Sequence, residues 1–139
     1  MIQIIAGEKG KGKTKILIDK ANSELKAAKG SIVYLDKSNK HMYELSNKIR
    51  LINVREYCIE NSSEFIGFIC GIVSQDHDLE KVYLDSFLKV ACTDEDGVNH
   101  VLNKLEKISD KFQVDFIISI SISDSILAED IRENVIVAL

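Results

Sequence analysis

The sequence predicts a three-layer α/β/α sandwich built on a mostly parallel sheet, in a single domain over residues 1–139. One observation is that short, nearly continuous apolar segments alternate with longer amphipathic ones, as buried strands alternate with helices. A second is the ordinary globular composition, with 45% hydrophobic and 29% charged residues and no linker, repeat or low-complexity segment. Strands that alternate with helices pair in parallel through right-handed crossovers.

The N-terminal half opens with an apolar strand and a turn rich in glycine and lysine. Apolar residues repeated every three or four positions after this turn predict a helix, and Gly30 is a good helix stop. A second buried-type strand then ends in an acid, Asp36. In chain order we expect a strand at 1–6, the turn at 7–12, a helix at 13–29, a strand at 31–36, a short helix at 41–48 and a short strand at 50–54.

The C-terminal half follows the same alternation. Ser62 or Ser63 can cap a helix, and an apolar stripe that begins at Val98 marks one face of another. Another apolar strand again ends in an acid, Asp85. In chain order we expect a helix to about residue 74, a strand at 81–85, an acidic loop at 93–96, a helix at 97–111, a strand at 114–121, a short helix at 124–132 and a last strand at 134–139.

Charge and composition argue against several functions. The formal net charge is −4, which disfavours nonspecific nucleic-acid binding, and no apolar run approaches the ~20 residues that span a membrane. No CxxC pair occurs, so neither a zinc ribbon nor a disulfide framework is indicated. We expect free, buried thiols in a reduced cytoplasm. The thiols are those of Cys58, Cys70 and Cys92. The histidines predict no metal site; they are His41, His77 and His100.

One motif in the sequence predicts a specific chemical function. The segment Gly7-Glu-Lys-Gly-Lys-Gly12-Lys13-Thr14 fits GxxxxGK[ST], the phosphate-binding P-loop or Walker A motif, at every fixed position. Glycines let backbone N–H groups wrap around a phosphate, and the helix that follows adds its free N–H groups. Lys13 would reach the β- and γ-phosphates, and the Thr14 hydroxyl would bind Mg²⁺.

Each residue of this segment is therefore a candidate ligand of a nucleotide. The flanking lysines would add positive potential, although they are equally compatible with solvated surface positions. The predicted nucleotide-binding residues are Gly7, Glu8, Lys9, Gly10, Lys11, Gly12, Lys13, Thr14 and Lys15.

A P-loop usually works with an acid at the end of a buried strand, facing Mg²⁺. Two acids fit, Asp36 after Ile-Val-Tyr-Leu and Asp85 after Lys-Val-Tyr-Leu. We favour Asp85, because a complete strand and helix separate it from the loop, and Asp36 ends the very next strand. Asp85 and Thr14 are then the metal ligands, and Lys13 and Asp85 the catalytic pair. Asp36 is expected near the edge of the site, or as a solvated acid.

The order of these elements resembles the RecA-like branch of P-loop NTPases. The resemblance covers most of the chain, and it rests on the P-loop and on the Asp85-Ser86 pair after an apolar strand. It implies the strand order 5-1-4-3-2, with a polar strand between the P-loop strand and the Asp85 strand. The end of that polar strand, with Ser119, Ser121 and Ser123, would lie beside the γ-phosphate. The same alternation is also typical of any half-exposed strand.

The chain departs from this family where hydrolysis is concerned. Many members carry a glutamate directly after the Walker B aspartate, where this chain has Ser86, and the RecA family places one where this chain has Ser38. Loss of catalytic groups costs orders of magnitude in rate. The missing glutamate is the base that activates water in these families, and the weaker substitutes for it are Glu44, Asp94 and Glu95. No arginine can be identified as an arginine finger; the arginines are Arg50, Arg55 and Arg132.

The motif and the resemblance together imply a Mg-ATP-binding protein of the cytoplasm that is a slow or partner-activated ATPase. Other nucleoside triphosphates remain open. In RecA-like proteins the site commonly lies between subunits, so a homo-oligomer or a protein partner would complete it; no membrane or nucleic-acid partner is indicated. The alternatives are a regulatory module that binds nucleotide without hydrolysis and, less favoured, a small-molecule kinase, which would need a lid with arginines.

Overall fold

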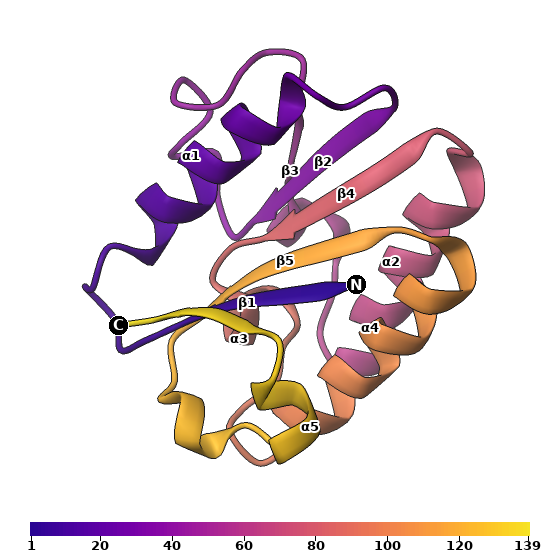
Figure 1. The fold of residues 1–139 in the computed structure, drawn as a ribbon. Coiled ribbons are helices and arrows are strands. Elements are labelled where there is room, and N and C mark those ends of the chain that lie inside the picture. Colours follow the sequence, from indigo (N-terminus) through magenta and orange to yellow (C-terminus); the bar gives the residue numbers. More distant parts are fainter.

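A six-stranded sheet forms the middle layer of the structure, a computed structural model that describes residues 1–139 (Figure 1). The sheet has the order β3-β2-β4-β5-β1-β6, and every neighbouring pair is parallel. The strands are β1 (Ile2–Ala6), β2 (Ser31–Asp36), β3 (Arg50–Asn53), β4 (Leu79–Leu84), β5 (Asp115–Ile120) and β6 (Val135–Ala138). This confirms the predicted fold class. The order differs from the expected five-stranded one by the extra edge strand β3, which lies beyond β2.

Helices cover both faces of the sheet. On one face lies α1, and the other helices occupy the opposite face and the ends of the strands (Figure 1). The helical elements are α1 (Lys13–Leu25), η1 (Val54–Tyr57), α2 (Ser62–Gln75), α3 (Phe87–Val90), α4 (Val98–Phe112), η2 (Asp124–Ile126) and α5 (Glu129–Arg132). No helix is long and apolar enough to cross a membrane.

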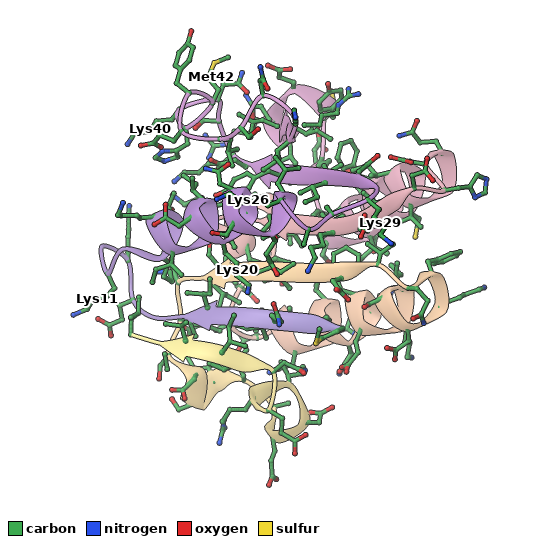
Figure 2. All side chains as sticks on the ribbon, turned by 45° about the horizontal axis from the view of Figure 1, so that its top comes forward. Lys11, Lys20, Lys26, Lys29, Lys40 and Met42 are labelled. Atoms are coloured by element: carbon green, nitrogen blue, oxygen red, sulfur yellow. The ribbon has the colours of Figure 1, made fainter.

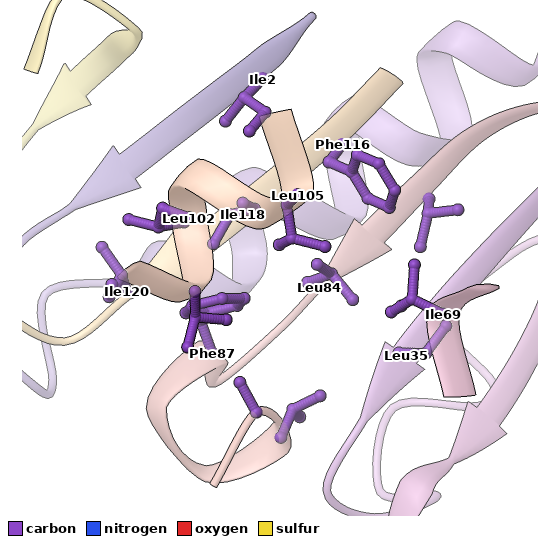
Figure 3. Close-up of a cluster of buried hydrophobic side chains, with 14 of the residues drawn as sticks. Ile2, Leu35, Ile69, Leu84, Phe87, Leu102, Leu105, Phe116, Ile118 and Ile120 are labelled. Atoms are coloured by element: carbon purple, nitrogen blue, oxygen red, sulfur yellow. The ribbon is translucent and has the colours of Figure 1, made fainter. Parts of the chain in front are cut away.

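The two faces of the sheet bury separate hydrophobic clusters. The larger has 27 buried residues and joins the strands to α2, α3, α4 and α5. Figure 3 shows part of it, where Phe87, Leu102 and Leu105 lie close to side chains of β5 such as Ile118. The smaller has 10 buried residues beneath α1, among them Tyr34 and Tyr83. Each fully buried large apolar side chain stabilises the fold by about 1.5–3 kcal/mol, so both helical layers are firmly held.

The structure corrects two of the predicted helix boundaries. The cap of α2 is Asn61, not Ser62 or Ser63, because the Asn61 side chain accepts a hydrogen bond from the Glu64 N–H at 2.9 Å. The helix expected to reach residue 29 ends at Leu25, after which the chain turns through hydrogen bonds that span three residues.

The prediction of a short helix over residues 41–48 is wrong, since this segment forms turns. The side chain of Asn22 on α1 holds it, donating to the Glu44 carbonyl at 2.9 Å and accepting from the Ser46 N–H at 2.8 Å. Leu45 of this segment, and Ile49 directly after it, pack under α1. A long-range anchor therefore overrides the local helical tendency. Residues 124–132 likewise form two short helices, η2 and α5, in place of one.

The cysteine prediction is half right. Cys58, Cys70 and Cys92 are free, as expected, but all three are exposed where burial was predicted. For Cys70 and Cys92 the adjacent apolar residues Ile69 and Ala91 take the buried positions instead.

Candidate functional site

A cavity of about 320 Å³ opens at the carboxyl edge of the sheet. Loops that follow different parallel strands meet at this edge, which is where open α/β sheets usually bind ligands. The cavity is lined by the loop after β1 and the start of α1 (Lys9, Gly10, Gly12, Lys13, Thr14), by the residue after β2 (Lys37), by the segment after β4 (Asp85, Ser86, Leu88, Lys89) and by the end of β5 (Ser119, Ser121).

The glycine-rich loop, residues 7–12, has a backbone that depends on its glycines. Gly10 and Gly12 both have φ of 87°, a left-handed conformation that residues with a Cβ rarely adopt. Gly7 is required for a different reason, because a Cβ there would lie 2.9 Å from the Cβ of Leu139. Gly12 is also the N-cap residue of α1, and no side chain caps that end. The first N–H groups of α1 therefore stay available to an anion in the cavity.

Lys13 is the first residue of α1 and is only 7% exposed. Its ammonium donates to the Glu8 carbonyl oxygen at 2.8 Å and forms no ion pair. Burial lowers the pKa of Lys13, and the nearby Asp85 carboxylate partly offsets that effect. The loop thus holds a poorly solvated positive charge at the wall of the cavity, where an anionic ligand would be favourable.

Asp85, which follows β4, is 2% exposed and accepts four hydrogen bonds. Its Oδ1 accepts from the Thr14 hydroxyl at 3.2 Å, the Ser119 hydroxyl at 2.6 Å and the Ser86 N–H at 2.9 Å. Its Oδ2 accepts from the Tyr34 hydroxyl at 2.8 Å. One buried carboxylate therefore joins the start of α1 to β2, β4 and β5.

Asp36, the other candidate acid, is 3% exposed but does not line the cavity. Its carboxylate accepts from the Lys37 N–H at 2.7 Å. Burial raises the pKa of Asp36, and the negative charge of Asp85 raises it further. The Thr14 hydroxyl thus meets Asp85 and not Asp36.

Asp36→Asn is expected to stabilise the metal-free protein at pH 7, raising its melting temperature by a few degrees. A carboxyl whose pKa is higher in the folded state destabilises that state once pH exceeds its unfolded pKa, here 3.8. The amide keeps an oxygen for the Lys37 N–H without the buried charge. Melting curves in EDTA between pH 4 and pH 8 should show the advantage of the variant shrinking towards pH 4. An advantage that grows towards acid pH would contradict the account.

Tyr34 contacts this site through Asp85 and was not identified as a site residue from the sequence. Its ring is fully buried and stacks on that of Tyr83, with centroids 6.2 Å apart. Its hydroxyl nevertheless binds Asp85, and burial together with that carboxylate raises the pKa of Tyr34. A signal was available, since a fully buried tyrosine needs a partner for its O–H. What the sequence could not supply was the alignment of β2 with β4.

Tyr34→Phe is expected to destabilise the protein by about 1–3 kcal/mol, because Oδ2 of a buried carboxylate loses its only hydrogen bond. Tyr83→Phe is the matched control. It removes the same atom from the other ring of the stack, but its partner Glu24 has a side chain that is 24% exposed and can be hydrated. Urea unfolding of both variants measures the difference. A loss for Tyr83→Phe equal to or larger than that for Tyr34→Phe would argue against the special role of Tyr34.

The remaining predicted loop residues lie in different surroundings. Lys9 lines the cavity, and Glu8 contributes a carbonyl while its side chain is exposed. Lys15 pairs with Asp19 at 3.8 Å on the outer surface of α1. Figure 2 shows Lys11 extending away from the body of the protein. Neither Lys11 nor Lys15 lines the cavity.

The serines and the candidate substitute bases also lie in different places relative to the cavity. Ser119 and Ser121 line the cavity, whereas Ser123 caps η2 by accepting from the Ser125 N–H at 3.3 Å. The weaker candidates for a base contact other groups: Glu44 contacts the His41 ring, and Asp94 accepts from the Gly97 N–H at 2.9 Å. None of Glu44, Asp94, Glu95, Arg50, Arg55 and Arg132 lines the cavity.

Two further cavity residues carry positive charge and were not singled out in the sequence, Lys37 and Lys89. Lys37 follows β2, and Lys89 lies in α3. The pKa of Lys89 is lowered first by contact with the Lys37 amine and also by the charge of Lys9. These lysines belong to different segments, so only the folded sheet brings them together.

Comparison with known proteins identifies the fold and no family. No family model matches the chain, and no curated protein matches it in sequence. Among solved structures, the chain is similar to the crystal structure of the flagellar accessory protein FlaH from Methanocaldococcus jannaschii, with a TM-score of 0.56 and 14% sequence identity. The match covers 93% of this chain and 63% of FlaH, so this chain spans less than two thirds of that protein. At this identity the likeness shows the three-layer fold alone.

Proposed function

We propose that this protein binds Mg-ATP in the cavity at the carboxyl edge of its sheet and is a slow or partner-activated ATPase of the RecA-like branch of P-loop NTPases. The observation that carries the proposal is the hydrogen bond between the Thr14 hydroxyl and Asp85 Oδ1, residues 71 positions apart. It joins the last residue of the P-loop motif to the acid favoured as its Walker B partner. The likeness to FlaH supports the fold on which this site is built.

The donor set suits magnesium. Mg²⁺ prefers oxygen ligands and is usually held by one or two protein groups together with phosphate oxygens and water. Thr14 and Asp85 offer a hydroxyl and a carboxylate side by side, with the Ser119 hydroxyl next to them. The structure contains no group of three or more His, Cys, Asp or Glu side chains that could hold a metal ion. A metal at Asp85 would complete its coordination with phosphate oxygens and water.

The residues of the chain have separate roles in this proposal. The loop N–H groups and the start of α1 bind the phosphate chain, and Lys13 exchanges its hydrogen bond with the Glu8 carbonyl for one with a phosphate oxygen. Mg²⁺, when bound, would neutralise charge on the phosphates. Tyr34 and Ser119 fix the orientation of the Asp85 carboxylate.

Slow hydrolysis is proposed because the cavity has no evident base. Asp85 is the sole carboxylate among its lining residues, and that carboxylate already accepts four hydrogen bonds. Ser86 lines the cavity where many RecA-like proteins have a glutamate. A second copy of this chain or another protein would then supply the missing group. The same observations also suit the second candidate, a regulatory module that binds ATP and hydrolyses little.

Phosphate release separates these two candidates. Purified protein is incubated with Mg-ATP or Mg-GTP over a wide range of protein concentrations, with Lys13→Ala as the control. Release that disappears in the control and rises per subunit with concentration supports an ATPase whose site is completed by assembly. No release, with nucleotide still raising the melting temperature, supports the binding module. Absence of both effects would contradict the proposal.

A cytoplasmic location belongs to the same proposal. The cytoplasm supplies Mg-ATP and keeps thiols reduced, which suits the three exposed free cysteines of this chain.

A further inference from the structure

Lysine side chains surround the proposed phosphate site on more than one side. Besides Lys13, the cavity is lined by Lys9 from the glycine-rich loop, Lys37 from the end of β2 and Lys89 from α3. None of these four lysines takes part in an ion pair. The chain as a whole carries a net charge of −4, so this concentration of positive charge is local.

The positive charges around this cavity repel one another. Lys9, Lys37 and Lys89 line the same cavity, and the nearby Lys37 and Lys9 lower the pKa of Lys89. Like charges held together without counterions destabilise the folded protein, and a bound anion would remove that cost. The charges converge on a cavity of about 320 Å³, which suits a compact anion better than an extended polyanion on an open surface.

The sheet order tells where each lysine stands along the cavity. The loop comes from β1, whereas Lys37 and Lys89 follow β2 and β4, and β5 lies between β4 and β1. The Lys37–Lys89 pair therefore faces the glycine-rich loop across the end of β5, where Ser119 and Ser121 line the cavity. A phosphate chain held by the loop would reach this pair with its outermost group.

We propose that Lys37 and Lys89 bind the terminal phosphate of a nucleoside triphosphate, so that a single subunit distinguishes triphosphates from diphosphates. This inference rests on the proposed function, because it takes the glycine-rich loop as the site of the inner phosphates. The two ammonium groups neutralise the extra charge of the triphosphate from within the same chain. They are binding residues, and the missing base would still come from a partner.

The test compares ATP with ADP. The double variant Lys37→Gln/Lys89→Gln is titrated with Mg-ATP and with Mg-ADP in low salt, and dissociation constants are measured by calorimetry. Lys104→Gln/Lys107→Gln is the matched control, since it removes the same charge from exposed positions on α4. We expect the Lys37/Lys89 variant to lose at least about 10-fold in affinity for ATP and less than about 3-fold for ADP. The control variant should stay within about 2-fold of the wild type for both nucleotides.

Each other outcome overturns a defined part of the account. Equal losses for ATP and ADP would mean that the pair attracts anions generally and does not bind the terminal phosphate. Unchanged affinities, with Lys13→Ala still abolishing binding, would remove Lys37 and Lys89 from the site and leave the proposed function intact. A wild-type protein that binds neither nucleotide would overturn the proposed function and this inference together.

Discussion

Lys13→Ala is expected to weaken the binding of Mg-ATP by at least about 100-fold, which in practice abolishes it. The lost group is a buried ammonium with no ion-pair partner, and hydrogen bonds to charged groups contribute about 1.5–3 kcal/mol each. The charge attraction to two phosphates adds to this value. Calorimetric titration with Mg-ATP measures the effect.

The fold of this variant should remain intact. Burial lowers the pKa of Lys13, which means that the folded state disfavours its charge, so removing the ammonium should leave the melting temperature unchanged or slightly higher. Lys11→Ala is the matched control, because Lys11 belongs to the same loop but is exposed and does not line the cavity. Unchanged ATP affinity in Lys13→Ala would refute the assignment of the P-loop.

Asp85→Asn is expected to weaken Mg-dependent binding of ATP by about 10- to 100-fold, the usual effect of losing a group that holds or orients a metal ligand. The carboxylate lies against the Thr14 hydroxyl, and an amide would oppose an N–H₂ donor to at least one of its four donors. The measurement is ATP affinity as a function of Mg²⁺ concentration. Binding in EDTA should change much less.

Asp36→Asn provides the control for this prediction. Asp36 is the last residue of β2 and Asp85 directly follows the neighbouring β4. Both come after a Tyr-Leu pair, and both are buried. Only Asp85 meets Thr14, so the Mg²⁺ dependence of Asp36→Asn should stay close to that of the wild type. The reverse ranking of the two variants would mean that Asp36 is the metal-binding acid.

The strands of the sheet could be predicted well because each one is marked by a pattern of apolar residues within its own segment. Short apolar runs such as Ile32–Leu35 are typical of strands buried on both faces, and the expected strand order came from the resemblance to RecA-like proteins. The sequence predicted less well where distant side chains decide. Residues 41–48 do not form a helix because Asn22, on another element, binds their backbone. The strand expected at 50–54 forms as β3, but the sequence did not predict its place in the sheet, at the open edge beside β2.

The candidate site shows the same division. The loop residues and Asp85 are visible in the sequence because a fixed motif and a strand end mark them. Tyr34, Lys37 and Lys89 are not visible, since their importance comes from the alignment of β2 with β4 and of both with the loop. Conversely, the motif cannot tell that Lys11 and Lys15 lie outside the cavity, because a regular spacing says nothing of side-chain direction.

The central claim is that one cavity binds the phosphates of ATP together with Mg²⁺. A crystal structure grown with Mg²⁺ and a non-hydrolysable ATP analogue tests it most directly. The account predicts the triphosphate within the cavity, with Lys13 on a phosphate oxygen, Mg²⁺ beside Thr14 and Asp85, and the terminal phosphate next to Lys37 and Lys89. Nucleotide bound elsewhere, for instance in the groove between β3 and α2 near Tyr57 and Phe68, would contradict it.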